Sequence, residues 1–410
     1  MKMLSRIKNS LFFRNRDFAL LWTGQAVSSC GGWINYVALN VLLYEITGSG
    51  SALGIFFAVR TLPSLIFGAA GGFLADRYSK KNLMIICDSV RAIAVLCFIF
   101  FREPALFYIL GFILSAFDKI YASASLAAVP EIVSRKDLTE ANSLSRMSQS
   151  LTAIIGPAAG GAIVGFAGYT ASFAADSASF LFSVATLLMI GASMRPHMAG
   201  ESKEGFIAEF KNAFSFIIAS GALLSFLLLR IADGLGSGAY NTALPIFSSI
   251  HSEGGCLYGW LVTSWGIGAF LGAAAAGPLS KRIKTVRLYF CSTLLMAAGM
   301  GGTFLLPCRT ESAAPYLLPI LSIAAGGFGD GISGVIFSSL LMEKTPREMA
   351  GKVFGCVSSL IYMACGAGMY ISGAAIDHIP LSVAVIAGTG LIALSAAAAA
   401  IHINSGKHSQ

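Results

Sequence analysis

The stretch Gly71-Gly72-Phe73-Leu74-Ala75-Asp76-Arg77-Tyr78-Ser79-Lys80-Lys81 is a short charged turn between two long apolar runs, and it decides the fold. Its glycines let two helices approach closely at a bilayer surface. Asp76 and Arg77 supply a carboxylate and a guanidinium that can pair there or cap a helix end. Lys80 and Lys81 place the turn on the cytoplasmic side of a membrane. We therefore predict that this turn is a conformational latch of a membrane protein.

A weaker copy of the turn, Gly277-Pro278-Leu279-Ser280-Lys281-Arg282, begins 205 residues after Gly72, which is half the length of the 410-residue chain. This spacing predicts two copies of one helical bundle. Within the polar stretch between them, residues 206–214 have the periodicity of a helix that lies in the membrane interface. The predicted domains are an N-terminal six-helix bundle, a cytoplasmic linker with an interfacial helix and a C-terminal six-helix bundle, at 1–194, 195–220 and 221–410.

Composition excludes a soluble protein, because 56% of the residues are hydrophobic and only 12% are charged. A soluble domain carries about twice that charged fraction. Runs of about 20 apolar residues can span a bilayer as helices. Twelve such runs predict an all-α membrane protein with 12 transmembrane helices, at 18–45, 51–75, 83–102, 104–130, 143–167, 170–194, 221–249, 257–280, 288–306, 314–342, 351–376 and 381–402.

The basic residues indicate how the chain is oriented. The net charge of +8 is scattered over short loops, which is typical of positive-inside topology and not of nucleic-acid binding. With the N-terminus inside, nearly all loop lysines and arginines are cytoplasmic, and Arg102 and Arg309 lie outside. The apolar stretch after residues 1–18 is too long for a signal-peptide core, so we expect the first helix to be retained. The predicted location is the cell inner membrane, with both termini cytoplasmic.

Metal and cofactor chemistry is not indicated. The eight cysteines include no Cys-x-x-Cys pair, and the five histidines are dispersed, so we expect neither a metal site nor a disulfide framework. No P-loop, His-Glu-x-x-His or Ser-His-Asp arrangement occurs. We therefore expect a protein that is not an enzyme and needs no cofactor.

The helix pattern and the turn together resemble the major facilitator superfamily, whose members are built from repeats. The match lies in Gly-x-x-x-Asp-Arg-x-x-Lys after the second helix, with Ser79 where that family usually has glycine. The fifth helix resembles the Gly-Pro-x-x-Gly-Gly core of the family's antiporter motif, which is associated with export. Thr152 stands where that motif prefers glycine. The matching residues are Gly156, Pro157, Gly160 and Gly161.

Further stretches are similar to the enterobactin-exporter and macrolide-efflux branch of the superfamily. The branch often has Gly-Asp-Trp in the first helix, where this chain has Gly31-Gly32-Trp33, so no role of that aspartate is carried over. The similar stretches cover most of the chain and are Asn15-Arg16-Asp17-Phe18-Ala19-Leu20-Leu21-Trp22, Arg60-Thr61-Leu62-Pro63, Pro130-Glu131-Ile132-Val133, Ala141-Asn142-Ser143-Leu144 and Pro346-Arg347-Glu348-Met349-Ala350-Gly351-Lys352-Val353.

Charged side chains at membrane depth are costly, and each is a candidate functional residue. The resemblance implies that the first, fourth, seventh and tenth helices line a central cavity. Every charge predicted near mid-depth lies on the fourth, seventh or tenth of these, which favours a polar substrate path through the cavity. These residues are Asp118, Lys119, Arg230, Asp233 and Asp330.

Two interpretations of Arg230 and Asp233 stay open. They lie at i and i+3 and share a helix face, so they can form a structural pair. Alternatively, Arg230 receives a substrate anion while Asp233 holds it in place. Asp118 and Lys119 are adjacent and point about 100° apart, so one of them should face a neighbouring helix. Asp330, which has no cation nearby in sequence, is our first choice for a proton carrier; the alternative is pairing with Lys119 or Arg230.

The predicted residue roles fall into three groups. Neutral side chains of the first helix either bind substrate or bond other helices. Asp88 and Arg91, near the cytoplasmic end of the third helix, are expected to tie to the Asp76 turn. The substrate-binding candidates are Arg230, Lys119, Asn35, Tyr36 and Gln25. The proton-coupling candidates are Asp330, Asp233 and Asp118. The latch candidates are Gly72, Asp76, Arg77, Lys80, Lys81, Asp88 and Arg91.

The predicted function is secondary active export of small amphipathic molecules by alternating access, with proton antiport. The absence of a nucleotide-binding motif leaves an ion gradient or the substrate itself as the driving force. A siderophore substrate is favoured by Arg230 and Lys119, and multidrug or macrolide efflux by an aromatic-rich lining. A non-transporting membrane receptor on the same fold and an uptake symporter are the other interpretations. The expected partners are the substrate, protons and membrane lipid, with a monomeric chain.

Overall fold

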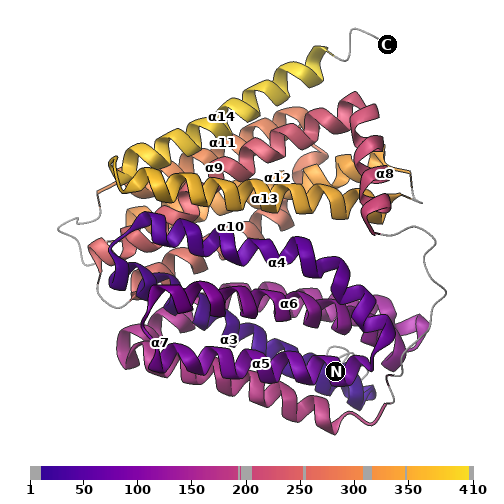
Figure 1. Ribbon diagram of the computed structural model, residues 1–410. Coiled ribbons are helices and arrows are strands. Elements are labelled where there is room, and N and C mark those ends of the chain that lie inside the picture. Colours follow the sequence, from indigo (N-terminus) through magenta and orange to yellow (C-terminus); the bar gives the residue numbers. More distant parts are fainter. Residues whose placement is uncertain are drawn as a thin grey trace, which may run out of the picture. The chain divides into compact units, whose positions relative to one another are not determined.

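The structure, a computed structural model, describes residues 11–192, 194, 206–252, 255–307, 316–346 and 349–405, and these are folded into helices without any strand (Figure 1). Contacts divide the chain into two compact units. Unit 1 comprises Met1–Leu42 and Leu62–Glu201, and unit 2 comprises Leu43–Thr61 and Ser202–Gln410. No motif or change of composition indicates that Leu43–Thr61 packs with unit 2. The predicted domain limits stay a prediction.

Each unit is a bundle of long helices. The helices whose described residues lie largely in unit 1 are α2 (Leu11–Arg14), α3 (Arg16–Thr47), α5 (Lys80–Phe100), α6 (Pro104–Ile132), the short η1 (Arg135–Asp137) and α7 (Leu138–Met189). Helix α4 (Gly50–Arg77) contributes its first part to unit 2 and the rest to unit 1. Unit 2 also holds α8 (Phe206–Ala219), α9 (Gly221–His251), α10 (Cys256–Ser280), α11 (Thr285–Leu305), α12 (Leu317–Lys344), α13 (Ala350–Ile376) and α14 (Leu381–Ser405).

Within the described residues, each predicted apolar run lies mainly on one of these helices, and the all-helical membrane fold is confirmed. Two runs, 143–167 and 170–194, share α7, which turns at Gly168 with a φ of 78°. That backbone conformation is open to glycine and strained for other residues. Among the described residues, ten helices are long and apolar enough to span a membrane. The count of twelve spans therefore stays a prediction.

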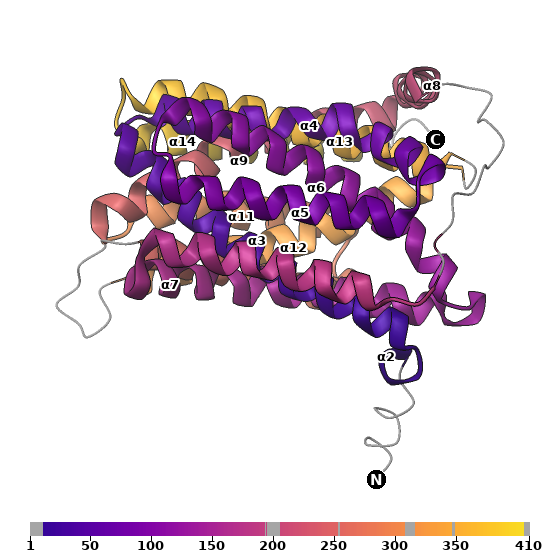
Figure 2. The same ribbon diagram turned by 60° about the horizontal axis from the view of Figure 1, so that its bottom comes forward.

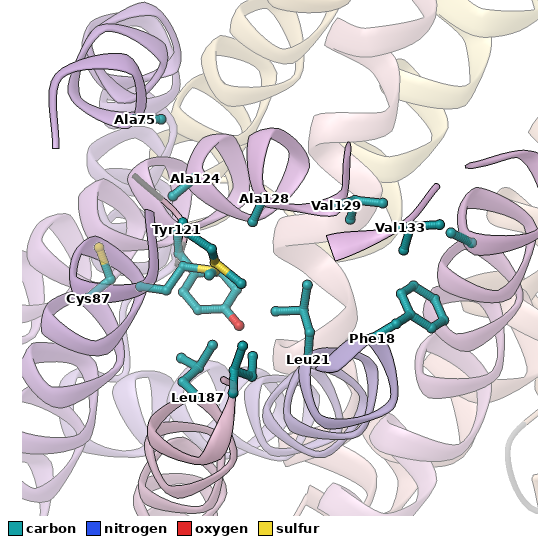
Figure 3. Packing of buried hydrophobic residues seen from close by; sticks show 14 of the residues in the cluster. Phe18, Leu21, Ala75, Cys87, Tyr121, Ala124, Ala128, Val129, Val133 and Leu187 are labelled. Atoms are coloured by element: carbon teal, nitrogen blue, oxygen red, sulfur yellow. The ribbon is translucent and has the colours of Figure 1, made fainter. Parts of the chain in front are cut away.

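One end of unit 1 holds a core in which α3, α5, α6 and α7 meet (Figure 3). Phe18 and Leu21 of α3 and Leu187 of α7 are each 1% exposed. Tyr121 of α6 lies among them, and Cys87 of α5 lies at the edge. Because lipid is as apolar as these side chains, dispersion contacts in close packing hold such a core more than exclusion of water does.

Small residues of the antiporter-like motif bring α7 close to α3 within unit 1. A side chain at Gly156 would meet Cγ of Trp33 at 3.0 Å, and one at Gly160 would meet Cα of Ile34 at 2.9 Å. Gly161 is buried in the same helix. Thr152, where the motif prefers glycine, instead shares a hydrogen bond of 3.1 Å with the hydroxyl of Ser29 on α3. The glycines of the antiporter-like motif therefore allow α3 and α7 to pack closely.

The glycines around Asp330 have the same packing role in unit 2. A side chain at Gly327 or Gly331 would collide with the backbone carbonyls of Trp265 or Ala269 on α10. On another side of the helix, Gly329 meets the backbone of α11. Helix α12 is therefore held tightly against both α10 and α11, and this fixes the position of Asp330 along the bundle.

Candidate transport site

Arg230 and Asp233 of α9 form a buried ion pair in unit 2. Nη1 of Arg230 lies 3.3 Å from Oδ2 of Asp233, and the two side chains are 16% and 4% exposed. They stand one helical turn apart, as the i, i+3 spacing predicted. The pair leaves both interpretations of Arg230 open, because a substrate anion can still approach a guanidinium that has further donors.

Asp233 is anchored by helices other than its own. Ser395 of α14 donates a short hydrogen bond to Oδ1, and the hydroxyl of Tyr289 on α11 lies 3.5 Å from Oδ2. Together with Arg230, these donors stabilise the charged carboxylate. Sequence reasoning missed Ser395 and Tyr289, because a lone serine or tyrosine in an apolar run is common and the partner lies far away in the chain.

The guanidinium of Arg230 is not fully satisfied by this pairing. Its carbon lies 5.1 Å from the centroid of the Phe337 ring, a cation–π contact that favours the charged form. Its buried Nε has no hydrogen-bond partner among the described residues. Arg230 therefore keeps one donor that a ligand or a rearranged neighbour can use.

Asp330 is the less restrained carboxylate of this cluster. It is half-buried on α12, and the structure's described part gives its carboxylate neither a hydrogen bond nor an ion pair; only its backbone carbonyl accepts a bond, from Ser333. It interacts electrostatically with Arg230 and Asp233. The unit 2 cluster thus holds two carboxylates and one guanidinium, so it carries one negative charge in excess when all three are ionised.

Unit 1 has a charge cluster around Arg91 of α5. Arg91 forms a short ion pair with Asp88 on its own helix, and its Nη1 lies 3.3 Å from Oδ1 of Asp118 on α6. The rings of Tyr121 and Phe180 lie 4.6 and 4.4 Å from its guanidinium carbon. The side chain of Asp88 is fully buried and that of Asp118 is 53% exposed. Arg91 therefore couples an internal carboxylate to an exposed one.

This arrangement brings a predicted latch residue, Arg91, together with a predicted proton-coupling residue, Asp118. Lys119 joins them, with its Nζ 3.6 Å from Oδ2 of Asp118 and its side chain 40% exposed. Asp118 does face a neighbouring helix, α5, through Arg91. The two carboxylates and two cations of this cluster have no net charge, whereas the unit 2 cluster has one negative charge in excess.

The polar residues of α3 differ in their surroundings. Gln25 donates a short hydrogen bond to the hydroxyl of Ser125 on α6. Asn35 is 6% exposed, and within the described ranges its Oδ1 has no hydrogen-bond partner. The ring of Tyr36 packs edge-on against Trp33, with centroids 5.6 Å apart. Gln25 therefore bonds another helix, while Asn35 keeps an acceptor for a ligand or an internal water.

The charged turn fastens the start of α5 to the ends of two other helices. Nζ of Lys80, whose side chain is 4% exposed, lies 2.5 Å from Oε1 of Glu131 near the end of α6. Lys81 donates to the carbonyls of Leu188 and Ile190 at the end of α7, at 3.1 and 2.8 Å. Cations at helix C-termini are stabilised by the helix dipole.

The rest of the predicted latch is only partly described. The exposed Arg77 lies over the Phe73 ring, with 5.9 Å between its guanidinium carbon and the ring centroid. Gly72 and Asp76 lie within α4, whose last turns take up the first part of the predicted turn, and the structure describes nothing of the side-chain surroundings at these two positions. The partners seen for Asp88 and Arg91 belong to the unit 1 charge cluster. The latch role of these residues therefore stays a prediction.

Comparison with known proteins identifies the family. The family model described as transmembrane secretion effector matches residues 10–408, so the chain belongs to this family of major facilitator superfamily transporters. The predicted resemblance is confirmed, and the relatives are transporters and not enzymes.

Several curated relatives are each 25% identical to this chain. The MFS-type transporter YfiS of Bacillus subtilis aligns over 92% of this chain and 91% of its own length. The enterobactin exporter EntS of Citrobacter koseri aligns over 87% and 84%, and macrolide efflux protein A of Streptococcus pyogenes over 88% and 90%. The relatives thus include both kinds of transporter after which the predicted branch is named, an enterobactin exporter and a macrolide efflux protein.

Solved structures confirm the fold. A mutant of the nucleoside transporter NupG superposes with a TM-score of 0.78 and 12% identity, covering 93% of this chain and 98% of that one. A bacterial homologue of the iron transporter ferroportin in an inward-facing state gives 0.72 and 14%, covering 94% and 98%. At such identities the likeness concerns the fold alone.

Proposed function

We propose that this chain is a secondary active exporter of small amphipathic molecules, working by alternating access and coupled to proton antiport. The observation that carries the proposal is the unit 2 cluster, in which the Asp330 carboxylate interacts electrostatically with the Arg230–Asp233 ion pair but has no hydrogen bond or ion pair of its own among the described residues. An excess negative charge inside a membrane bundle is costly, and binding a proton removes it. The antiporter-like glycines of α7 are consistent with export.

The two carboxylates of this cluster have different roles in the proposal. Asp233 is the structural carboxylate, because two hydroxyl groups and the guanidinium of Arg230 donate hydrogen bonds to it. Asp330 lacks such donors among the described residues and is the group that takes up and releases a proton. Its charge changes how strongly Arg230 attracts a second anion, and this links proton binding to substrate binding.

The proposed substrate carries carboxylate or catecholate groups, as siderophores do. Arg230 of unit 2 offers its Nε, which has no hydrogen-bond partner among the described residues. Lys119 of unit 1, whose side chain is 40% exposed, stays a separate predicted substrate-binding residue. Relatives named enterobactin exporter support this substrate class. The proposed location is the cell inner membrane, with both termini cytoplasmic.

Efflux of macrolides or other lipophilic drugs is the second candidate. The edge-on Trp33–Tyr36 pair on α3 offers ring surface to an apolar ligand, and a relative is named macrolide efflux protein A. Such a ligand would not need Arg230.

Ligand binding to the purified protein separates these candidates. We expect a carboxylate siderophore to bind the wild type and to lose about tenfold or more in affinity in Arg230→Gln, because one charge-assisted hydrogen bond is lost. Lys344→Gln, at the exposed end of α12, is the matched control and should bind as the wild type does. If the protein binds a macrolide equally well with and without Arg230→Gln and binds no siderophore, the siderophore proposal is wrong and drug efflux is supported.

A further inference from the structure

Helix α4 is divided between the two units at a proline. Its first part, up to Thr61, belongs to unit 2, and its second part, from Leu62, belongs to unit 1. Pro63 lies just beyond this division, inside the helix. Proline has no N–H and cannot donate to the carbonyl of Val59, so the helix is weakened and easily bent there.

The first part of α4 packs backbone to backbone on α13 (Figure 2). A side chain at Gly50 would lie 2.8 Å from the carbonyl oxygen of Gly373, and one at Gly54 would lie 2.8 Å from that of Met369. Nearer the division, a side chain at Gly366 would lie 3.0 Å from Oγ1 of Thr61. Such a contact has few interlocking side chains, so the two helices can separate and meet again without repacking.

Asp377, directly after α13, closes this contact at one end. Its carboxylate accepts hydrogen bonds from the backbone N–H groups of Gly50 at 2.6 Å and Ser51 at 3.0 Å, and from the Ser49 hydroxyl at 2.9 Å. The first N–H groups of a helix have no partner within the helix, and an anion there also meets the positive end of the dipole. A residue outside α4 therefore caps its first turn.

We propose that Asp377 is a gating residue of the transport cycle. Its cap and the glycine contact clamp the start of α4 onto α13, at the end predicted to face away from the cytoplasm. The clamp releases in each cycle, and α4 bends at Pro63 as its first part leaves α13. This inference rests on the alternating access of the proposed function.

The release is tested by labelling a cysteine at Thr61, which faces Gly366 across the contact. Thr61→Cys is introduced into a background without native cysteines, and the full chain is reconstituted in liposomes with a membrane-impermeant maleimide outside. We expect Asp377→Asn to speed labelling about tenfold, because charge-assisted hydrogen bonds are lost. His378→Asn, an exposed neighbour in the same loop, is the matched control and should leave the rate unchanged. Equal rates in all three proteins would overturn the gating role.

A second variant tests whether release is required for transport. Ser49→Cys with Asp377→Cys, in the same background, places two thiols where the hydroxyl and the carboxylate now meet. We expect oxidation to stop substrate movement and a reductant to restore it, whereas Asp377→Cys alone should not respond to oxidation. Full transport by the oxidised double variant would refute the clamp as a gate.

The labelling measurement needs no substrate, so it separates the two proposals. Faster labelling in Asp377→Asn supports the gate even if no proton-driven flux is found, and in that case only the proposed antiport fails. Unchanged labelling together with proton-driven flux leaves the antiporter standing and overturns the gate.

Discussion

Three aspartates show how the surroundings of a carboxylate decide its use. Asp233 and Asp377 each accept several hydrogen bonds, whereas the Asp330 carboxylate accepts none within the part of the chain that the structure describes. A carboxylate held by donors contributes to structure as an anion, and one without donors is free to change its charge. These aspartates therefore respond differently to the same substitution.

Replacing Asp233 and Asp330 by asparagine separates a structural carboxylate from a functional one. Asp233→Asn leaves Arg230 as an unpaired charge in a buried place, which costs about 3 kcal/mol of stability. Asp330→Asn removes no contact that the structure describes, so its thermal unfolding in detergent should match the wild type within about 0.5 kcal/mol. Equal loss of stability in the two variants would show that Asp330 is also part of the structural framework.

The Asp377 clamp should not respond to pH near neutrality. Burial raises the pKa of this carboxyl, but hydrogen bonds from Ser51, Ser49 and Gly50 outweigh it and hold the pKa below the ordinary 3.8. A depressed pKa gives stabilisation that is complete above the ordinary value and is lost as pH falls through the lowered one. Maleimide reacts with the thiolate, so labelling of any cysteine slows at lower pH, and the clamp is therefore read from a ratio of rates. With His378→Asn present in both proteins, the ratio of Thr61→Cys labelling with Asp377→Asn to that without it should be the same at about pH 6 and about pH 8. A ratio that falls toward one at the lower pH would contradict this.

At the scale of the helix, much of the structure was predictable and its long-range contacts were not. Apolar runs and charged turns are visible in the sequence, so the helices and the mid-depth charges on α6, α9 and α12 could be named. The Ser395 and Tyr289 contacts to Asp233, and the Asp377 cap on α4, join residues far apart in the chain. Serine and tyrosine give no signal of a partner, and a single sequence contains no information about which distant pairs meet.

Close approach of α3 and α7 at Gly160 can be tested by adding one methyl group. Gly160→Ala places Cβ 2.9 Å from Cα of Ile34, and the resulting backbone shift should cost about 1–3 kcal/mol. Gly334→Ala, in α12, meets nothing within 4 Å and should be stabilising by about 0.5–1 kcal/mol, because alanine is the better helix former. Thermal unfolding in detergent measures both; a destabilised Gly334→Ala with a neutral Gly160→Ala would contradict the packing.

The Lys80–Glu131 ion pair should fasten α5 to α6. In a double-mutant cycle of Lys80→Met and Glu131→Gln, we expect a coupling free energy of about 1–3 kcal/mol, because Lys80 is nearly buried. The exposed pair Arg14–Asp137 is the control, and Arg14→Gln with Asp137→Asn should couple by less than about 1 kcal/mol. No difference between the two cycles would show that the turn does not hold these helices.

At the scale of the whole molecule, the charge clusters of the two units differ. The unit 1 cluster is balanced by Arg91 and Lys119, while the unit 2 cluster has one negative charge in excess. This asymmetry supports the proposed proton binding in unit 2. The substrate is not determined by the fold, because the same architecture is found in transporters of very different names.

Flux from reconstituted proteoliposomes under an imposed pH gradient is the measurement that tests proton coupling through Asp330. A carboxylate siderophore and a lipophilic cationic dye are compared in the wild type and in Asp330→Asn. We predict gradient-driven movement of the siderophore by the wild type, and loss of the gradient's effect in Asp330→Asn while the protein remains folded. Siderophore movement that ignores the gradient, or that is equally gradient-driven in Asp330→Asn, would contradict proton coupling through this carboxylate.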